Sequence, residues 1–221
     1  IELTPPPDAP PPMSAPLIEV RACTPADAEL AVPLIISSGP AAFNYIFADT
    51  ALEQMPHFVR RAFQDDGMEL GHSVHTAMLL DDRLSAVGAL WHAGQALPFM
   101  AAGVHQIYRH YGPLAGTRVV MRGLRMETVV KPPRKGIAYL GHFGVAPELQ
   151  GHGLGTLLIQ HLIDQARKLG FATVALDVSS GNPRAQKLYE QLGFIVKKIN
   201  PADSRTEFGA IIEHRYMEKT I

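Results

Sequence analysis

The sequence predicts a mixed α/β fold, in which a β-sheet carries helices on both faces. Strand-like segments and a hairpin come first along the chain, a strand–helix–strand unit follows, and further strand-like segments close the sequence. Of the 221 residues, 47% are hydrophobic and 19% are charged. This composition excludes a wholly disordered chain and is sufficient for a closed core.

The N-terminal half supplies a first strand, two helical regions and the hairpin. Residues Leu17–Arg21 alternate in polarity as a strand does. Thr24 and Pro25 form a helix start, because a capping side chain is followed by a proline at the first helical position. We expect helices over 25–37 and across most of 39–71, and strands over 73–80 and 83–92 joined by a turn at Asp81–Asp82.

The C-terminal half begins with a long helical region and then alternates strand and helix. Residues 93–136 predict a mainly helical stretch that ends in a basic turn containing two prolines. Beyond it we expect strands over 138–145 and 173–178, helices over 153–169 and 183–192, and two closing strands over 194–198 and 211–218.

The chain divides into a short arm and one domain. Residues 1–16 contain seven prolines and almost nothing that could join a core. Proline lacks the amide donor that helices and sheets need, and it favours an extended backbone. We therefore expect an arm over 1–16 and a single domain over 17–221, with exchange of the arm between two copies as a route to a homodimer.

The charge balance and the cysteine count disfavour several classes of protein. Twenty basic and 21 acidic residues give a net charge of −1, whereas a general nucleic-acid binder carries an excess of lysine and arginine. No segment reaches the roughly 18 uncharged apolar residues of a membrane span. Cys23 is the only cysteine, and the ten histidines lack the spacing of metal ligands. We expect a cytoplasmic protein with no metal and no nucleic-acid or membrane partner.

One segment has the composition of an anion-binding turn. The strand over 138–145 is followed by a short turn and then by Gln150–Gly151–His152–Gly153–Leu154–Gly155–Thr156 at the start of a helix. Glycines let the backbone turn tightly and approach a ligand without interference from a Cβ atom. The first amides of a helix have no internal partner, and the helix dipole is positive there. The segment therefore predicts a site for a diphosphate group.

Two common diphosphate sites fit this segment poorly. A P-loop requires a lysine followed by serine or threonine after its last glycine, and Gly155 is followed by Thr156 and Leu157. A dinucleotide site of an oxidoreductase would use Asp177, which lies at the end of the next strand. However, the glycine spacing is G-x-G-x-G rather than G-x-G-x-x-G, and four residues separate the strand from the glycines. A nicotinamide or flavin oxidoreductase is therefore disfavoured.

The pattern Gln-x-x-Gly-x-Gly, at Gln150, Gly153 and Gly155, fits without adjustment, and a second motif runs from Asn182 through Tyr189 to Phe194. With both motifs in order, the sequence resembles the GNAT superfamily of acyl-CoA-dependent N-acyltransferases. The resemblance implies a central, mostly antiparallel sheet flanked by helices and containing a splayed strand pair. It also implies transfer of an acetyl group from acetyl-CoA to a primary amine by direct attack, the acceptor being a small molecule, an amino acid or a protein amine.

The resemblance also assigns roles to individual residues. The pantetheine arm of acetyl-CoA would pair with Phe143, Gly144 and Val145, and Asn182 would reach that arm or fix the open strand end. The pyrophosphate would rest on the amides of Gln150, Gly151, His152, Gly153, Leu154, Gly155 and Thr156. Tyr189 would lie near the thioester sulfur. A phenol with a pKa of about 10 is protonated at neutral pH, so we expect Tyr189 to act as the general acid toward the leaving thiolate.

The general base is left open by the sequence. In the resembling family a Glu or His often lies eleven or nine residues before the Gln, and those positions are Tyr139 and Gly141 here. His142 is adjacent, but strand alternation turns it to the opposite face unless a bulge at the neighbouring glycines shifts the register. Candidates for the acceptor pocket are Tyr139, His105, His110 and Glu127, and a water chain is an equal alternative. Without a base, the chain would be a silent acyl-CoA-binding module.

Overall fold

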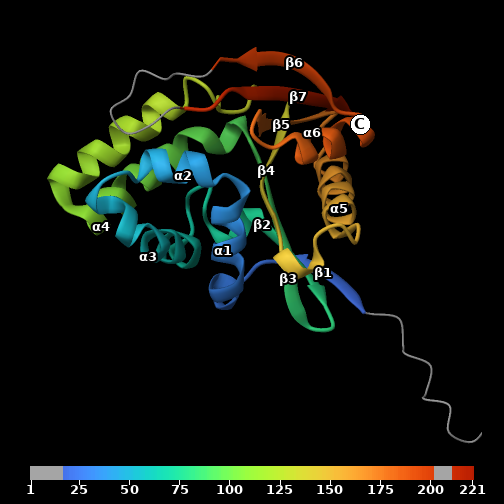
Figure 1. Ribbon diagram of the computed structural model, residues 1–221, viewed down its shortest axis with the longest axis horizontal. Helices are drawn as coiled ribbons and strands as arrows, with labels where there is room; N and C mark the ends of the chain where they lie inside the picture. Colours follow the sequence, from blue (N-terminus) through green and yellow to red (C-terminus); the bar gives the residue numbers. More distant parts are fainter. Residues whose placement is uncertain (1–16, 202–210) are drawn as a thin grey trace, which may run out of the picture.

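The computed structural model describes residues 17–201 and 211–221, and the arm expected over 1–16 lies outside them. The described residues form one seven-stranded sheet in the order β1-β2-β3-β4-β5-β7-β6. Helices α1 to α4 lie on one side of the sheet and α5 and α6 on the other, as Figure 1 shows. This is the mixed, mostly antiparallel architecture that the sequence predicts. The assignment of 17–221 to a single domain stays a prediction.

The N-terminal half builds one edge of the sheet and the helical layer over it. The hairpin turn at Asp81 and Asp82 is confirmed, since both residues have positive φ angles, 48° and 62°, and β2 and β3 pair antiparallel. The elements in order are β1 (Ile18–Ala22), a short 3-10 turn (Pro25–Asp27), α1 (Ala28–Ser38), α2 (Pro40–Ile46), α3 (Thr50–Asp65), a second 3-10 turn (His72–Val74), β2 (His75–Leu80), β3 (Arg83–His92) and α4 (Ala93–Met126).

The C-terminal half builds the strands that frame the predicted anion-binding turn. Strand β4 (Ala138–Val145) leads through a 3-10 turn (Pro147–Leu149) into α5 (Leu154–Lys168). The chain then forms β5 (Thr173–Ser179), α6 (Pro183–Gln191), β6 (Ile195–Asn200) and β7 (His214–Thr220). The predicted bounds of β3 and β4 are confirmed to the residue, whereas the long helical region over 93–136 ends at Met126 and is broken at Gly112, whose φ is 71°.

Two irregularities in the sheet surround β4. It pairs with β5 in parallel only at Ala138↔Val174 and Tyr139↔Ala175, so the two strands part immediately afterwards. On its other side β4 pairs antiparallel with β3, and the register of this pairing shifts. Gly141 faces Ala89, whereas Gly144 faces Val87. Three steps along β4 therefore match two along β3, which is a β-bulge. The splayed strand pair expected from the sequence is present.

The core is split between the two faces of the sheet. Side chains of β2 alternate, so that Ala77 and Leu79 pack toward α1 and α3 while Met78 packs toward α5. Helix α5 contributes Leu158, Ile159 and Leu162, which are at most 1% exposed. Both faces are thus closed by helices, and these packed layers hold the separated ends of β4 and β5 in place.

Candidate functional site

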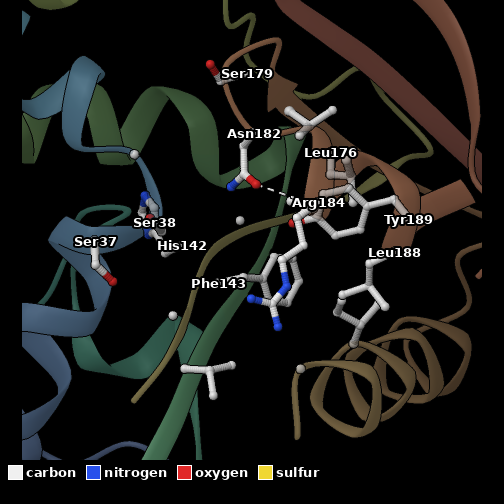
Figure 2. Close-up of a pocket in the computed structure, with 18 of the residues that line it drawn as sticks. Ser37, Ser38, His142, Phe143, Leu176, Ser179, Asn182, Arg184, Leu188 and Tyr189 are labelled. Carbon is white, nitrogen blue, oxygen red and sulfur yellow. Dashed lines mark hydrogen bonds between the residues drawn. The ribbon is translucent and has the colours of Figure 1, made fainter. Parts of the chain in front are cut away.

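A cleft of about 800 Å³ lies where β4 and β5 separate. Its walls are the second half of β4, the turn into α5, the end of β5 with the start of α6, and the end of α1 with the start of α2. Figure 2 shows His142 beside Ser37 and Ser38 on one side of the cleft, and Asn182, Arg184 and Tyr189 on the other. The cleft therefore joins the predicted anion-binding turn to several titratable side chains.

The turn before α5 has the backbone geometry of an anion site. Gly151 and Gly153 have φ angles of 89° and 85°, a conformation that other residues adopt only with strain. Gly153 is the N-cap residue of α5, so no side chain covers the first amides of the helix. The side-chain amide of Gln150 donates a hydrogen bond to the carbonyl oxygen of Val145 at 3.3 Å, which ties the turn to the end of β4. The first amides of α5 therefore open into the cleft beside Thr156, as an anionic group requires.

Two cations on α6 line the cleft. Arg184 and Lys187 project from α6, and the Arg184 guanidinium passes close to Gly151, since a Cβ atom there would lie 3.3 Å from its Nη2. Within the described residues neither side chain forms an ion pair. Neither cation is among the site residues predicted from the sequence. Their spacing of three residues on a helix that faces a glycine turn is the signal that could have identified them.

Asn182 closes the open end of β5 by capping α6. Its side-chain oxygen accepts a hydrogen bond from the amide of Ala185 at 3.0 Å, the interaction drawn in Figure 2. This cap leaves the side-chain NH₂ group available at the edge of the cleft. Asn182 can thus fix the strand end and also donate to a ligand.

Tyr189 lies on the α6 side of the cleft with a buried ring and an accessible hydroxyl. The residue is 8% exposed, and its ring packs 6.2 Å from that of Phe143 and 6.0 Å from that of Phe194. Burial raises the pKa of the phenol above its ordinary value, so it is protonated at neutral pH. The hydroxyl has no partner among the described residues but is not fully buried, so it is open to the cleft.

Asp177 is a second titratable group in the cleft. Burial raises the pKa of its carboxyl to about 6, although the hydroxyl of Tyr139 donates a hydrogen bond to Oδ2 at 2.8 Å and acts in the opposite direction. Oδ1 is buried without a hydrogen-bond partner in the described part of the chain. From the sequence, Asp177 is expected only as a ligand in a dinucleotide site. Its position at the end of a strand beside the glycine turn is the signal that marks it, whereas the structure gives it a titratable carboxyl in the wall of this cleft.

His142 enters the cleft because of the bulge in β4. Its φ is 55°, in the left-handed region, and its partly buried ring lines the cleft rather than facing away from it. Simple strand alternation would have placed this ring on the opposite face, whereas the extra residue of the bulge turns it. The ring contacts Trp91 with centroids 5.3 Å apart.

Most of the residues predicted from the sequence lie together in this cleft. Lining residues include Phe143, Gly144, Val145, Gln150, Gly151, Gly153, Leu154, Gly155, Thr156, Asn182 and Tyr189. His152 differs, because its exposed side chain is not part of the cleft wall. None of the acceptor-pocket candidates Tyr139, His105, His110 and Glu127 lines the cleft, although the Tyr139 hydroxyl donates to Asp177. His110 instead packs against the rings of Phe58 and Tyr111.

Within residues 17–201 and 211–221, no group of three or more His, Cys, Asp or Glu side chains has the arrangement of a metal site. Over the same residues, no helix is both long enough and apolar enough to cross a bilayer.

The parted parallel strands, the glycine turn and the tyrosine after β5 are the features expected of acyl-CoA-dependent N-acyltransferases. Residues 52–194 match the acetyltransferase (GNAT) family, and the chain therefore belongs to this family. The crystal structure of an N-acetyltransferase from Staphylococcus aureus Mu50 has the same fold, with a TM-score of 0.66 at 13% identity over 91% of this chain and all of that one. Members of this family use acetyl-CoA.

Two curated relatives from Escherichia coli (strain K12) are similar over shorter stretches. Ribosomal protein bS18-alanine N-acetyltransferase is 47% identical over 57 residues, which cover 26% of this chain and 38% of that enzyme. The L-amino acid N-acyltransferase MnaT is 35% identical over 74 residues, which cover 34% of this chain and 42% of that enzyme. The matched regions span less than half of these relatives, so the relatives guide the choice of acceptor without defining it.

Proposed function

We propose that this chain transfers the acetyl group of acetyl-CoA to a primary amine by direct attack, with both substrates bound in the cleft together. The observation that carries this proposal is a single cleft whose wall joins the glycine turn before α5 to Tyr189 and Asp177. One end suits a diphosphate and the other end suits proton transfer. An enzyme that moves an acetyl group from a nucleotide thioester needs both.

The donor would lie along the gap between β4 and β5. Beyond Tyr139, β4 has no strand partner on its β5 side within the described residues, so the stretch Phe143–Val145 can bond an extended pantetheine chain as an added strand would. The amides at the start of α5 and the guanidinium of Arg184 would hold the pyrophosphate. This arrangement would bring the thioester to the end of the gap, beside Tyr189.

The chemistry would follow from the protonation states of two side chains. The amine nitrogen forms a bond to the thioester carbonyl carbon, and the carbon–sulfur bond breaks as the tetrahedral intermediate collapses. The proton lost by the amine passes by way of a water molecule to the Asp177 carboxylate, which is ionised above its pKa of about 6. The thiolate takes its proton from the hydroxyl of Tyr189, which burial keeps protonated. The products are the acetamide and free coenzyme A.

The acceptor would be an α-amino group, either of an amino acid or of a peptide N-terminus. The two curated relatives are named for an alanine of a ribosomal protein and for L-amino acids, and both of these acceptors carry an α-amine. An α-amine has a pKa of about 7.7–8.0, against about 10.4 for a lysine side chain. A larger fraction is therefore uncharged at neutral pH, which suits a base as weak as a carboxylate.

Release of free thiol from acetyl-CoA tests this proposal directly. The acceptor panel comprises alanine amide, an alanyl tripeptide, free amino acids and a lysine whose α-amine is blocked. We expect thiol release with the α-amines and acetylated product of matching mass. Arg184→Gln should raise the KM for acetyl-CoA about tenfold, because it removes a charge-assisted contact. Lys168→Gln is the matched control, since it removes an equally exposed cation at the far end of α5.

The two alternatives predict different results in the same assays. A silent acyl-CoA-binding module would gain thermal stability with acetyl-CoA but release no thiol with any amine. A dinucleotide oxidoreductase would be stabilised by NAD or FAD and not by coenzyme A. Either outcome would refute acetyl transfer as the function.

A further inference from the structure

A pair of histidines, far apart in the sequence, meets behind the cleft. Nε2 of His75 lies 3.1 Å from Nδ1 of His142, and Nδ1 of His75 lies 2.7 Å from the carbonyl oxygen of Gly71. The two rings are within 10° of parallel, with centroids 5.2 Å apart. A ring N–H donates in the plane of its ring, so the 3.1 Å contact between the two nitrogens joins the rings through their edges.

The hydrogen-bond partners determine the tautomer of each ring. The carbonyl of Gly71 can only accept, so Nδ1 of His75 must carry the proton and donate it. A neutral His75 then has a lone pair on Nε2, which can only accept from Nδ1 of His142. Nδ1 of His142 is therefore protonated, and Nε2 of a neutral His142 carries a lone pair. With the other tautomer of His142, two lone pairs would face each other across 3.1 Å.

Both rings are neutral at physiological pH. His75 is 1% exposed, and burial lowers its pKa to about 4. Burial, and then the neighbouring His75, lower the pKa of His142 to about 3. Among the charged groups nearby, Asp66 favours a charged His75 and His72 opposes it, but burial outweighs both.

The segment that carries the Gly71 carbonyl is firmly anchored, so the pair rests on a fixed acceptor. The Asp66 carboxylate accepts hydrogen bonds from the amide of Ser73 at 3.2 Å and from its hydroxyl at 2.8 Å. From α4, the side chain of Gln106 donates to the backbone carbonyl of Asp66 at 2.7 Å. Phe63 packs on the His75 ring with centroids 5.6 Å apart.

The free nitrogen of His142 is accessible from the cleft. Nε2 of His142 has no hydrogen-bond partner among the described residues, yet it is not one of their fully buried unpartnered atoms. It is therefore open to the cleft that its ring lines. His142 is three residues beyond the last β4–β5 pair and Asp177 is two residues beyond it, so the two side chains come from opposite strands of the gap.

We propose that His75 is a positioning residue that fixes the lone pair of His142 Nε2 toward the cleft, where it accepts a hydrogen bond from the attacking amine. The inference rests on the proposed function and deepens it. An uncharged primary amine has two N–H groups. One would donate to His142 while the other carries the proton that is lost in the attack. A secondary amine or a hydroxyl has a single hydrogen and cannot satisfy both, so the pair makes the site specific for primary amines.

The tautomer can be measured without any turnover. In protein labelled with ¹⁵N-histidine, long-range ¹H–¹⁵N correlation spectra distinguish a protonated from an unprotonated ring nitrogen, and His142→Gln assigns the signals. We expect His142 in the wild-type protein to carry its proton on Nδ1, with Nε2 unprotonated. A wild-type His142 with its proton on Nε2 would overturn the proposal. This spectrum decides the tautomer even if no amine proves to be an acceptor, so the two proposals can fail separately.

Kinetics test the consequence for specificity. His75→Phe keeps a buried aromatic ring but removes the acceptor for His142, whose proton should then move to Nε2. We expect kcat/KM for alanine amide to fall about tenfold or more, the size expected for the loss of one directed hydrogen bond. The preference for alanine amide over the secondary amine with a methyl group on its α-nitrogen should fall in parallel. The KM for acetyl-CoA should stay within about twofold, since no contact to acetyl-CoA changes.

Three further variants make the result interpretable. His75→Gln retains both a donor for Gly71 and an acceptor for His142 Nδ1, so it should restore most of the activity and the preference. His110→Phe makes the same replacement outside the cleft and should change neither. If His75→Phe does not fold, as judged by its melting curve, His142→Ala must still lose the preference for the primary amine. Full retention of that preference in either variant would overturn the proposal.

Discussion

At the residue scale, the cleft holds two ionisable groups whose environments separate their protonation states. Burial raises the pKa of both Asp177 and Tyr189, but their ordinary values lie on opposite sides of neutrality. At neutral pH the carboxyl is therefore ionised and the phenol is protonated. One residue can accept a proton and the other can donate one, which is the division of roles that amide formation from a thioester requires.

The pH dependence of the reaction should report Asp177. The carboxylate accepts a proton only when ionised, so kcat/KM should rise with pH through about 6 and then level off for an acceptor that is already uncharged. Asp177→Asn should lower kcat/KM by about 10²–10⁴-fold and abolish this rise. The measurement is a pH profile of thiol release in both proteins. An unchanged acidic limb in Asp177→Asn would assign the titration to another group.

Stability measurements separate lost chemistry from lost folding in this variant. A carboxyl whose pKa is raised by folding favours the folded state at low pH, and this contribution is lost as the pH rises through about 6. The neutral asparagine does not ionise and still offers an oxygen to the Tyr139 hydroxyl. Above this pH, Asp177→Asn should therefore unfold at the same temperature as the wild type or higher.

Replacement of Tyr189 by phenylalanine removes the hydroxyl and keeps the ring. We expect kcat to fall about 10²-fold because the thiolate loses its proton donor, with little change in the KM for acetyl-CoA. Tyr45→Phe is a matched control, since Tyr45 is 4% exposed and lies on α2 outside the cleft wall. Steady-state kinetics at saturating acceptor measure kcat and the KM for acetyl-CoA in both variants. Unchanged turnover in Tyr189→Phe would remove the assignment of Tyr189 as general acid.

At the element scale, the contact between α1 and β4 depends on the absence of a side chain at Gly144. A Cβ atom there would fall on the backbone carbonyl of Leu34, so α1 and β4 approach each other backbone to backbone. The helix can therefore reach the edge of the cleft, where Ser37 and Ser38 form part of the wall. Gly144, which the sequence predicts as part of a bulge in the strand, thus also determines the position of α1.

Gly144→Ala should destabilise the fold and weaken donor binding together. The added methyl group must displace α1 from β4, at a cost of about 1–3 kcal/mol in the free energy of unfolding. Gly123→Ala is the control, because Gly123 lies in α4 with open space around its Cβ position. It should stabilise the helix by about 0.5–1 kcal/mol. Chemical denaturation and acetyl-CoA titration of both variants test this, and equal stability of the two would contradict the account.

How far the sequence predicts each element depends on the range of the interactions that define it. Local signals sufficed for the hairpin at Asp81 and Asp82, for both bounds of β4 and for the glycine turn before α5. The break of α4 at Gly112 also has a local signal, since Pro113 follows it directly. The ion pair between Arg122 and Asp49, 3.3 Å long, instead joins distant segments. The bond between His75 and His142 joins residues 67 positions apart, and no periodicity indicates it.

At the scale of the whole molecule, the sheet consists of two parts joined by a short parallel ladder. Strands β1 to β4 carry α1 and most of α5, whereas β5, β7 and β6 form an antiparallel group beside α6 (Figure 1). Only two residue pairs link β4 to β5 in register. The cleft lies along the rest of that seam, so a ligand that pairs with β4 there completes an interrupted sheet. The cleft is in this sense a consequence of the topology.

Binding of acetyl-CoA should therefore protect the seam more than any other part of the chain. At 100 times its dissociation constant, a ligand that binds only the folded state contributes about 2.7 kcal/mol, or roughly 5–11 °C in melting temperature for a chain of this size. Hydrogen exchange followed by mass spectrometry should show slower exchange over 143–156 and 176–189, since new bonds form to those amides.

The core of α3, which lies outside the cleft wall, should exchange at the same rate with and without the ligand and serves as the internal control. Coenzyme A without the acetyl group should protect the same peptides, because most of the contacts are made by the nucleotide and the pantetheine arm. NAD should protect neither region. Protection spread evenly over the sheet would mean that the ligand stabilises the fold without occupying the gap between β4 and β5.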